Sequence, residues 1–98
     1  MAQIVYARRA LADLERLADF LLESAPTAAI QTIDLVLEAV EILENHPLIG
    51  RPTGTALREL VISRGKSAYL ALYSYEELQD TVLVLAVRHG REAGYSEE

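Results

Sequence analysis

Cysteine and tryptophan are absent from this chain of 98 residues, and lysine occurs once. The absence of cysteine excludes disulfide bonds and thiolate metal sites, and it is compatible with a cytoplasmic protein. No uncharged apolar run approaches the roughly 18 residues that a membrane span requires. No apolar signal region precedes Arg8 and Arg9 near the N-terminus. We therefore expect a cytoplasmic protein that does not enter a membrane.

The charge is acidic overall but unevenly distributed. The net charge of −6 argues against broad, unspecific binding to nucleic acid, which depends on neutralising phosphates. Residues 1–49 contain three basic and eight acidic side chains, whereas residues 50–75 contain four basic and one acidic. The middle of the chain is therefore locally basic. Hydrophobic residues make up 51% of the chain, which suffices for one core, and we expect a single domain over residues 1–98.

Hydrophobic periodicity predicts a strand and then a pair of helices. Residues 3–6 are apolar and β-prone, and residues 8–23 repeat apolar side chains at three- and four-residue spacing. The predicted buried stripe of this first helix is Leu11, Leu14, Ala18, Leu21 and Leu22, widened by Leu17 and Phe20, with Asp13, Glu15, Arg16, Asp19 and Glu23 on the polar side. Pro26 interrupts the pattern, and residues 27–44 form a second helix with Ile33, Val36, Leu37, Val40 and Leu43 buried. The short connection predicts an α-helical hairpin.

The pattern then changes to a period of two. His46-Pro47 ends the second helix, and Gly50, Pro52 and Gly54 predict an ordered loop over residues 45–56. Three strands follow at residues 57–62, 67–75 and 81–88, separated by turns at 63–66 and 76–80. Short turns between consecutive strands predict an antiparallel meander with the helices on one face, an α+β fold. The polar tail, residues 89–98, is expected to be poorly ordered at its end.

This order of elements, together with several short motifs, resembles the RelE/ParE family of toxins. The resembling segments are the loop Pro47 to Pro52, the run Leu57-Arg58-Glu59-Leu60, the aromatic strand Tyr69 to Tyr75, and Val87-Arg88-His89-Gly90-Arg91. The resemblance covers nearly the whole chain and implies a β-α-α-β-β-β toxin fold. The Arg88-His89-Gly90-Arg91 ending is more similar to the ParE, or plasmid stabilisation, branch than to the ribosome-dependent nucleases.

The first candidate cluster is Arg58, Arg64 and Lys66. Arg58 lies in a predicted strand, where it either forms a salt bridge or contacts a phosphate or an acidic partner. Arg64 and Lys66 lie on a turn, where side chains are exposed to solvent. The sequence alone does not decide between the salt bridge and the contact to a phosphate or a partner for Arg58.

The second cluster is Arg88, His89 and Arg91, at the end of the last strand. It is either an exposed strand terminus or a site, since functional side chains concentrate at strand ends and loops. In a metal-independent nuclease, His89 would act as general base or acid, and arginines such as Arg58, Arg64 or Arg88 would hold the phosphate.

Other candidates have simpler explanations. His46 lies where the second helix ends and suits a capping role there. Tyr69, Tyr73 and Tyr75 alternate on one strand and favour core or interface packing over base stacking. Two histidines without ligand spacing and no cysteine give no support for a metal site, and we expect no cofactor.

The resemblance implies two activities. A ParE-like toxin would inhibit DNA gyrase by protein–protein contact, which requires no catalytic residue. A RelE-like toxin would be a ribosome-dependent mRNA endonuclease using His89 and the arginines; a third possibility is a non-toxic remnant that only binds an antitoxin. In each case the expected partner is a cognate antitoxin whose segment folds on binding, contacting Arg58, Tyr73 and Arg88. Arg58, Arg64, Arg88 and Arg91 are the expected contacts to the target or to phosphate. Homodimers and hetero-oligomers with the antitoxin both remain open.

Overall fold

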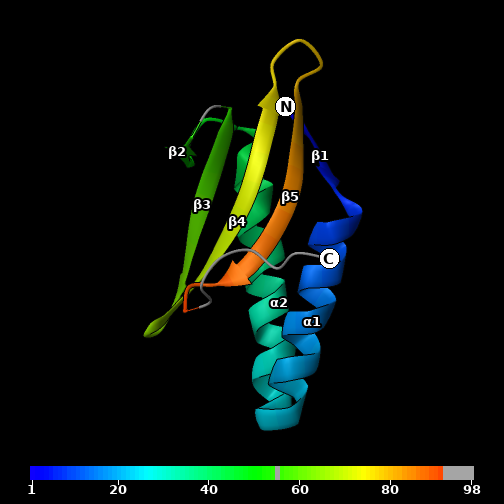
Figure 1. Ribbon diagram of the computed structural model, residues 1–98, viewed down its shortest axis with the longest axis vertical. Helices are drawn as coiled ribbons and strands as arrows, with labels where there is room; N and C mark the ends of the chain where they lie inside the picture. Colours follow the sequence, from blue (N-terminus) through cyan, green and yellow to red (C-terminus); the bar gives the residue numbers. More distant parts are fainter. Residues whose placement is uncertain (55, 92–98) are drawn as a thin grey trace.

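The computed structural model describes residues 1–54 and 56–91. A five-stranded sheet packs with one face on a helical hairpin, and the tip of the hairpin extends past the end of the sheet (Figure 1). The molecule is elongated, with extents of 42 × 25 × 24 Å. The predicted α+β fold is confirmed. In the described part of the chain, none of the helices has both the length and the apolar character needed to cross a membrane.

The helical hairpin follows the first strand directly. Strand β1 (Gln3–Tyr6) leads through Ala7 into α1 (Arg8–Ser24), and Ala25 alone separates α1 from α2 (Pro26–Glu41). Ala25 is not helical (φ −156°, ψ 80°), which breaks the helix and reverses the chain, and Pro26 begins α2 because proline fits the first helical turn. The 3₁₀ turn η1 (Ile42–Glu44) completes the second helix, so its predicted span of 27–44 is confirmed apart from its tightened end.

The sheet is mixed, with strand order β1-β5-β4-β3-β2. Strands β3 (Leu57–Arg64), β4 (Ser67–Glu76) and β5 (Thr81–His89) form the predicted antiparallel meander, and β1 adds to β5 in parallel. Gly65 has a φ of +58° in the two-residue turn that joins β3 to β4, which suits a tight hairpin. His89 belongs to β5 and not to the polar tail; the expectation for residues 92–98 lies outside the described residues.

One correction concerns the loop predicted over residues 45–56. Residues Arg51–Thr53 form a short edge strand, β2, which pairs antiparallel with β3. Pro52 is compatible with this strand because an edge strand leaves one side without ladder hydrogen bonds. Glycine and proline content alone therefore predicted a loop at residues where a short strand forms.

The core lies between the hairpin and the near face of the sheet. Its largest fully buried side chains are Tyr73, Leu43, Val36, Val40, Val82, Val84 and Val87. Tyr69 and Ala71 lie on the same face of β4 as Tyr73. The core packing predicted for Tyr69 and Tyr73 is therefore confirmed. A β-bulge places Leu85 as an extra residue in β5, because Leu72 pairs with Ala86 while Tyr73 pairs with Val84.

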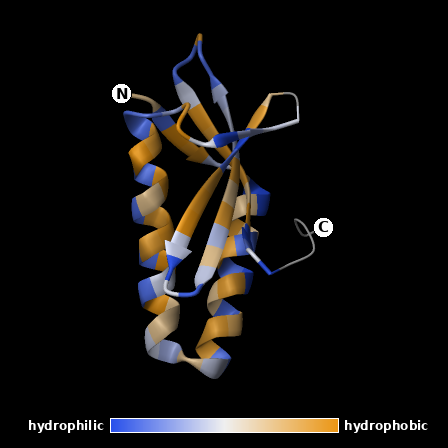
Figure 2. Ribbon diagram, turned by 90° about the vertical axis from the view of Figure 1, so that its left-hand side faces the viewer, coloured by the Kyte–Doolittle hydropathy of each residue, from blue (hydrophilic) through white to orange (hydrophobic). Residues whose placement is uncertain are grey.

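The buried stripe of α1 is rotated from the one predicted. Its buried residues are Ala10, Asp13, Leu14 and Leu17, whereas Leu11 and Leu22 are about half exposed (54% and 49%). Apolar residues are not confined to the buried side of the hairpin, since Ile30 of α2 is also exposed, and Figure 2 shows apolar colour distributed along both helices. The buried stripe of α1 includes Asp13 because α1 packs against β5, where the Asp13 side chain accepts a hydrogen bond from the buried Val87 N–H.

Candidate functional site

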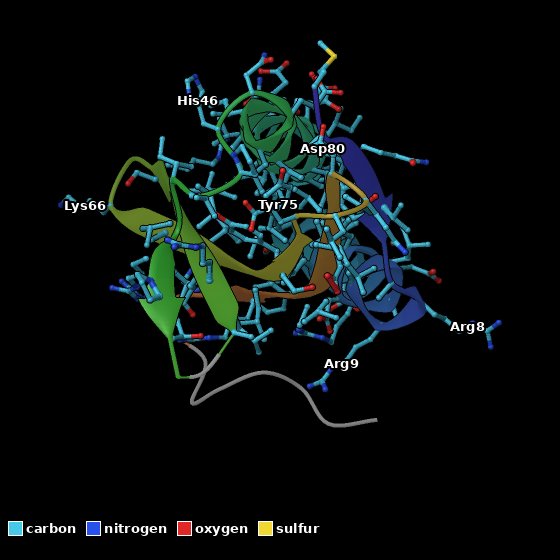
Figure 3. The ribbon with its side chains drawn as sticks, turned by 90° about the horizontal axis from the view of Figure 1, so that it is seen from above. Arg8, Arg9, His46, Lys66, Tyr75 and Asp80 are labelled. Carbon is cyan, nitrogen blue, oxygen red and sulfur yellow. The ribbon has the colours of Figure 1, made fainter. Side chains whose placement is uncertain are left out.

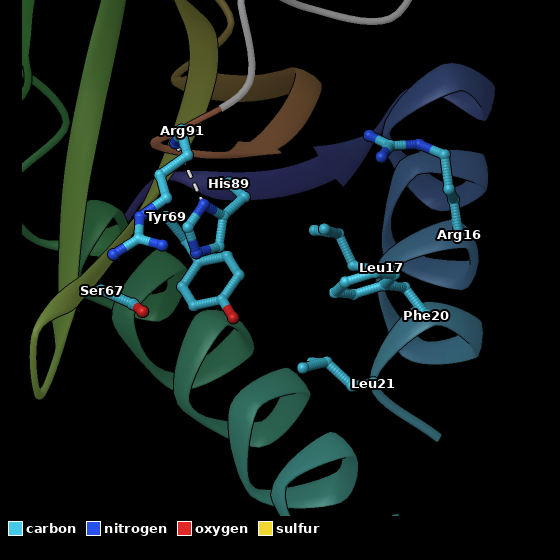
Figure 4. A pocket seen from close by; sticks show the side chains of 8 residues that line it. All are labelled: Arg16, Leu17, Phe20, Leu21, Ser67, Tyr69, His89 and Arg91. Carbon is cyan, nitrogen blue, oxygen red and sulfur yellow. Dashed lines mark hydrogen bonds between the residues drawn. The ribbon is translucent and has the colours of Figure 1, made fainter. Parts of the chain in front are cut away.

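A pocket of about 580 Å³ opens between α1 and the ends of β4 and β5. The helix contributes one wall and the two strand ends contribute the other (Figure 4). Its lining residues are Arg16, Leu17, Phe20, Leu21, Ser67, Tyr69, His89 and Arg91. An apolar floor with cationic groups at its margin is typical of sites that bind an anionic group attached to an apolar body.

The strand register brings His89 to this pocket. Tyr69 and His89 are partners across β4 and β5, and their rings meet edge to face with centroids 5.1 Å apart. The Arg91 N–H donates to Nδ1 of His89 at 3.0 Å, so Nε2 carries the proton in the neutral ring (Figure 4). The site therefore fixes both the orientation and the tautomer of this histidine.

A buried carboxylate joins the two walls of the pocket. Beyond Tyr6, strand β1 ends and α1 runs beside β5, so the Val87 N–H has no strand neighbour on that side. Asp13, 3% exposed, accepts this N–H through Oδ2 at 2.9 Å. Its other oxygen lies 3.6 Å from Nη2 of Arg16, which lines the pocket. Asp13 thus holds the helix to the strand two residues before His89, which corrects its predicted place on the polar side of α1.

Arg88 lies on the opposite face of the sheet from His89. Consecutive residues of a strand point to opposite faces, and Arg88 pairs with Leu70 while His89 pairs with Tyr69. The Nη1 of Arg88 contacts the His89 carbonyl at 3.3 Å. The cluster read from the sequence as Arg88, His89 and Arg91 is therefore divided, and only His89 and Arg91 share the pocket.

Arg58 and Tyr73 hold the loop before β2. The Nη1 of Arg58 donates to the carbonyls of Leu48 (2.9 Å) and Gly50 (2.8 Å). The Tyr73 hydroxyl donates to the Pro47 carbonyl at 2.8 Å and accepts the Gly50 N–H at 2.9 Å. Tyr73 is fully buried, so it cannot contact a partner directly. It can affect a partner-binding surface only by fixing the position of the loop.

Gly50 is required by this arrangement. A Cβ at this position would lie 2.6 Å from the Tyr73 hydroxyl oxygen and 2.7 Å from its Cε1. Burial raises the pKa of the Tyr73 phenol above 10.0, against the opposing effects of the Gly50 N–H and the nearby Arg58. The neutral phenol is therefore the form that the folded protein stabilises.

Four further residues, Arg64, Lys66, Arg51 and His46, do not line the pocket. Arg64 is the last residue of β3 and not a turn residue as predicted, and it donates to the Gln31 side chain of α2 at 3.2 Å. Lys66 does lie on the β3–β4 turn and projects outward from it (Figure 3). The ion pair next to Arg58 is formed by Arg51, whose Nη2 lies 2.5 Å from Oε1 of Glu59. His46 is exposed, and its main-chain N–H donates to the Ile42 carbonyl where the helix ends. Among the described residues, no three histidine, aspartate or glutamate side chains gather as metal ligands.

Sequence reasoning missed Arg16, Asp13 and Phe20 as parts of the site. It assigned Phe20 to the buried stripe, but its side chain is 67% exposed at the pocket margin. The signal available was the i,i+3 spacing of Asp13 and Arg16 on the predicted helix, which allows one pair to interact. Nothing in the sequence showed that this pair would face the last strand.

Comparisons with known proteins agree with the fold and define its class. The chain is 36% identical to Toxin RelE3 of Caulobacter vibrioides over 94% of this chain and 98% of that protein. It is 35% identical to Toxin RelE1 of the same organism, covering 91% and 94%. Among solved structures, the chromosomal ParDE system from P. aeruginosa matches with a TM-score of 0.76 and 22% identity, covering 91% and 96%. The intact E. coli RelBE complex matches with a TM-score of 0.65 and 16% identity, covering 94% and 100%.

These relatives place the protein among the toxins of type II toxin–antitoxin systems. The family model of the ParE toxin of type II toxin–antitoxin systems, parDE, matches residues 4–94. The chain therefore belongs to the ParE toxin family, within the wider RelE/ParE group that its sequence resembles.

Proposed function

We propose that this toxin acts on DNA gyrase by protein–protein contact, and that a cognate antitoxin neutralises it. The observation that carries this proposal is the division of the basic residues between the two faces of the sheet. Arg88 lies on one face, and His89 and Arg91 lie on the other. Either proposed target, gyrase or the ribosome, places the action of the toxin in the bacterial cytoplasm.

The chemistry of RNA cleavage explains why this division matters. Without a metal, cleavage needs a base at the ribose 2′-hydroxyl, cations at the phosphorane and an acid at the leaving oxygen, all within hydrogen-bond reach of one phosphate. Here Arg58 is engaged with main-chain carbonyls and Arg64 with Gln31. A gyrase inhibitor requires no such convergence, and the net charge of −6 disfavours approach to ribosomal RNA.

A second candidate, a ribosome-dependent mRNA endonuclease, is favoured by a separate observation. His89, Arg91 and Arg16 line one pocket, in which an imidazole with a defined tautomer shares its wall with Arg91 and faces the helical wall that carries Arg16 (Figure 4). The curated relatives are named RelE toxins. This candidate requires His89 to act as general acid or base.

The two candidates are separated by assaying the purified protein against both targets. We expect wild-type protein to inhibit supercoiling by gyrase and to trap cleaved DNA, and to leave mRNA intact on translating ribosomes. His89→Gln, which keeps a polar group of similar reach, is expected to retain gyrase inhibition. Transcript cleavage that depends on His89, with gyrase unaffected, would replace the first candidate by the second.

The antitoxin is proposed to cover the pocket and the neighbouring sheet. Leu17, Phe20 and Leu21 on the helical wall of the pocket suit an apolar side chain, and Arg16 and Arg91 suit a carboxylate beside it. Phe20→Ser is expected to weaken binding of the antitoxin measured by titration calorimetry. Glu15→Ser, on the exposed side of the same helix, is the matched control and is expected to bind as the wild type does.

A further inference from the structure

The charge of the pocket lining is opposite to that of the chain. The chain has 15 acidic and 9 basic residues, whereas the lining contains two arginines and neither aspartate nor glutamate. Arg91 belongs to the strand wall and Arg16 to the helical wall (Figure 4). A concave surface with cations on both walls and no acidic side chain attracts an anionic ligand.

The guanidinium group of Arg91 is the one that a ligand anion can engage. Its main-chain N–H donates to His89, but its side chain forms no hydrogen bond or ion pair with any residue that the structure describes. Arg16 is already paired, since its Nη2 lies 3.6 Å from Asp13. We therefore assign the direct contact to Arg91, and Arg16 adds to the positive potential around it.

Aromatic side chains line both walls of the pocket. Phe20, the one phenylalanine of the chain, is 67% exposed on the helical wall. Tyr69 and His89 form an edge-to-face pair on the strand wall, across the pocket from Phe20 (Figure 4). Aromatic rings pack favourably on one another in edge-to-face and offset arrangements. A planar aromatic ring is therefore the apolar body that suits the space between the walls.

The size of the pocket suits a small molecule. Its volume of about 580 Å³ lies within the roughly 300–1,000 Å³ that is usual for small-molecule sites. Such sites are mainly apolar and fix the orientation of the ligand with a few polar groups. Here those groups are the arginines, the His89 ring and the Ser67 hydroxyl.

The donors of the pocket favour a carboxylate over a phosphate. Phosphate is commonly held by main-chain N–H groups at a helix N-terminus or in a glycine-rich loop. The helical wall consists of residues 16–21, in the second half of α1, and the lining contains no glycine. One guanidinium group matches the two oxygens of a carboxylate.

We infer that this pocket is a binding site for a small aromatic carboxylate. The ring lies between Phe20 and the pair formed by Tyr69 and His89, and the carboxylate contacts the Arg91 guanidinium group. Since the antitoxin is proposed to cover the same pocket, the acid competes with the antitoxin, and this consequence alone rests on the proposed function.

Phenylacetate is the probe for this site, titrated into the full chain and followed by amide NMR. We expect a Kd on the order of 1 mM, as for a ligand of about ten non-hydrogen atoms, with shifts concentrated at residues 16–21 and 89–91. Cyclohexylacetate keeps the charge and lacks the aromatic ring, and phenylacetamide keeps the ring and lacks the charge. Each should bind at least about threefold more weakly. Equal affinity of either comparator, or tighter binding of phenyl phosphate, would overturn the inference.

Two variants locate the acid in the pocket. Arg91→Gln should weaken phenylacetate binding at least about fivefold and leave phenylacetamide unaffected, because only the acid uses the guanidinium group. Arg9→Gln, which removes an exposed arginine outside the pocket, is its control. Phe20→Leu should reduce the preference for phenylacetate over cyclohexylacetate. Leu78→Ser, 99% exposed on the β4–β5 turn, should keep that preference. Wild-type binding in both Arg91→Gln and Phe20→Leu would place the acid elsewhere and overturn the site.

Competition separates this inference from the proposed function. Phenylacetate at ten times its Kd should raise the apparent Kd of the antitoxin about elevenfold if both occupy the pocket. Binding of the acid without competition would remove the antitoxin from the pocket and leave the carboxylate site in place. Absence of phenylacetate binding, with antitoxin binding still weakened by Phe20→Ser, would overturn this inference alone.

Discussion

Tyr69 and Tyr73 lie on the same face of β4, yet their surroundings differ. Tyr73 is enclosed by a loop that bonds to its hydroxyl from both sides. Tyr69 is also buried, at 4% exposure, but it borders an open pocket, where its ring meets the His89 ring edge to face. One end of the core is thus closed by main-chain hydrogen bonds, and the other is left open beside α1. A single strand, β4, thus supports a loop fixed by hydrogen bonds at one end and an open pocket at the other.

Gly50→Ala is the substitution expected to destabilise the closed end of the core most. The added methyl group would overlap the Tyr73 hydroxyl and ring, so either the tyrosine or the loop must move. We expect a loss of about 2–3 kcal/mol in the free energy of unfolding, measured by urea denaturation.

Gly54→Ala is the control for this change. A Cβ at Gly54 meets nothing within 4 Å, but the φ of +73° strains an alanine, which costs about 1 kcal/mol. Equal losses in the two variants would show that the loop tolerates displacement and that it is not fixed by Tyr73.

The open end depends on Asp13. Asp13→Ala removes the acceptor of the buried Val87 N–H and the carboxylate beside Arg16. We expect a loss of about 2 kcal/mol, since the bond involves a charged acceptor and leaves a buried donor unsatisfied. Hydrogen exchange at the Val87 amide should accelerate more than at other core amides. Asp19→Ala, on the exposed side of α1, should leave both quantities unchanged.

The direct comparison of the two ends is Tyr73→Phe against Tyr69→Phe. Removal of the Tyr73 hydroxyl leaves the Gly50 N–H and the Pro47 carbonyl without their partner, and we expect a loss of about 1–2 kcal/mol. The Tyr69 hydroxyl faces the pocket (Figure 4), where water replaces it, so its removal should change stability by less than about 0.5 kcal/mol. The stability losses of the two variants are compared by urea denaturation under the same conditions. A larger loss in Tyr69→Phe than in Tyr73→Phe would show that the closed end of the core is at Tyr69.

The order of helices and strands was largely predictable from the sequence, because each element carries its own periodicity. Residues 27–44 repeat at helical spacing and residues 67–75 alternate, so their structures follow from local patterns. Strand β2 was not predictable in this way. Its three residues have no periodicity, and they become a strand only because Arg51 and Thr53 find partners on β3.

The candidate site was predictable only in part, because it depends on contacts between distant residues. His89 and Arg91 were identified from their position at the end of the last strand, and they do line the pocket. Arg88 was grouped with them although strand alternation directs it to the other face. Asp13 acquires its role from Val87, 74 residues further along the chain, and no local pattern reports such a contact.

The smallest expected effect is the dependence of stability on alkaline pH. Burial raises the pKa of Tyr73, and burial together with Glu41 raises that of Tyr6. A raised pKa means that the folded protein holds the proton more tightly than the unfolded chain, whose tyrosines titrate near 10.0. The contribution is therefore complete below pH 10 and is lost as pH rises through the higher folded value.

This dependence distinguishes a phenol sealed by its loop from one that water can reach. Urea denaturation between pH 8 and pH 11 should show unfolding free energy falling above pH 10 in the wild type. The fall should be shallower in Tyr73→Phe, with a remainder due to Tyr6 and to Tyr75, whose phenol donates to Asp80 at 2.6 Å (Figure 3). Leu78→Ser should follow the wild-type slope. An identical slope in Tyr73→Phe would mean that water enters beside the phenol, and the loop would then not be closed in solution.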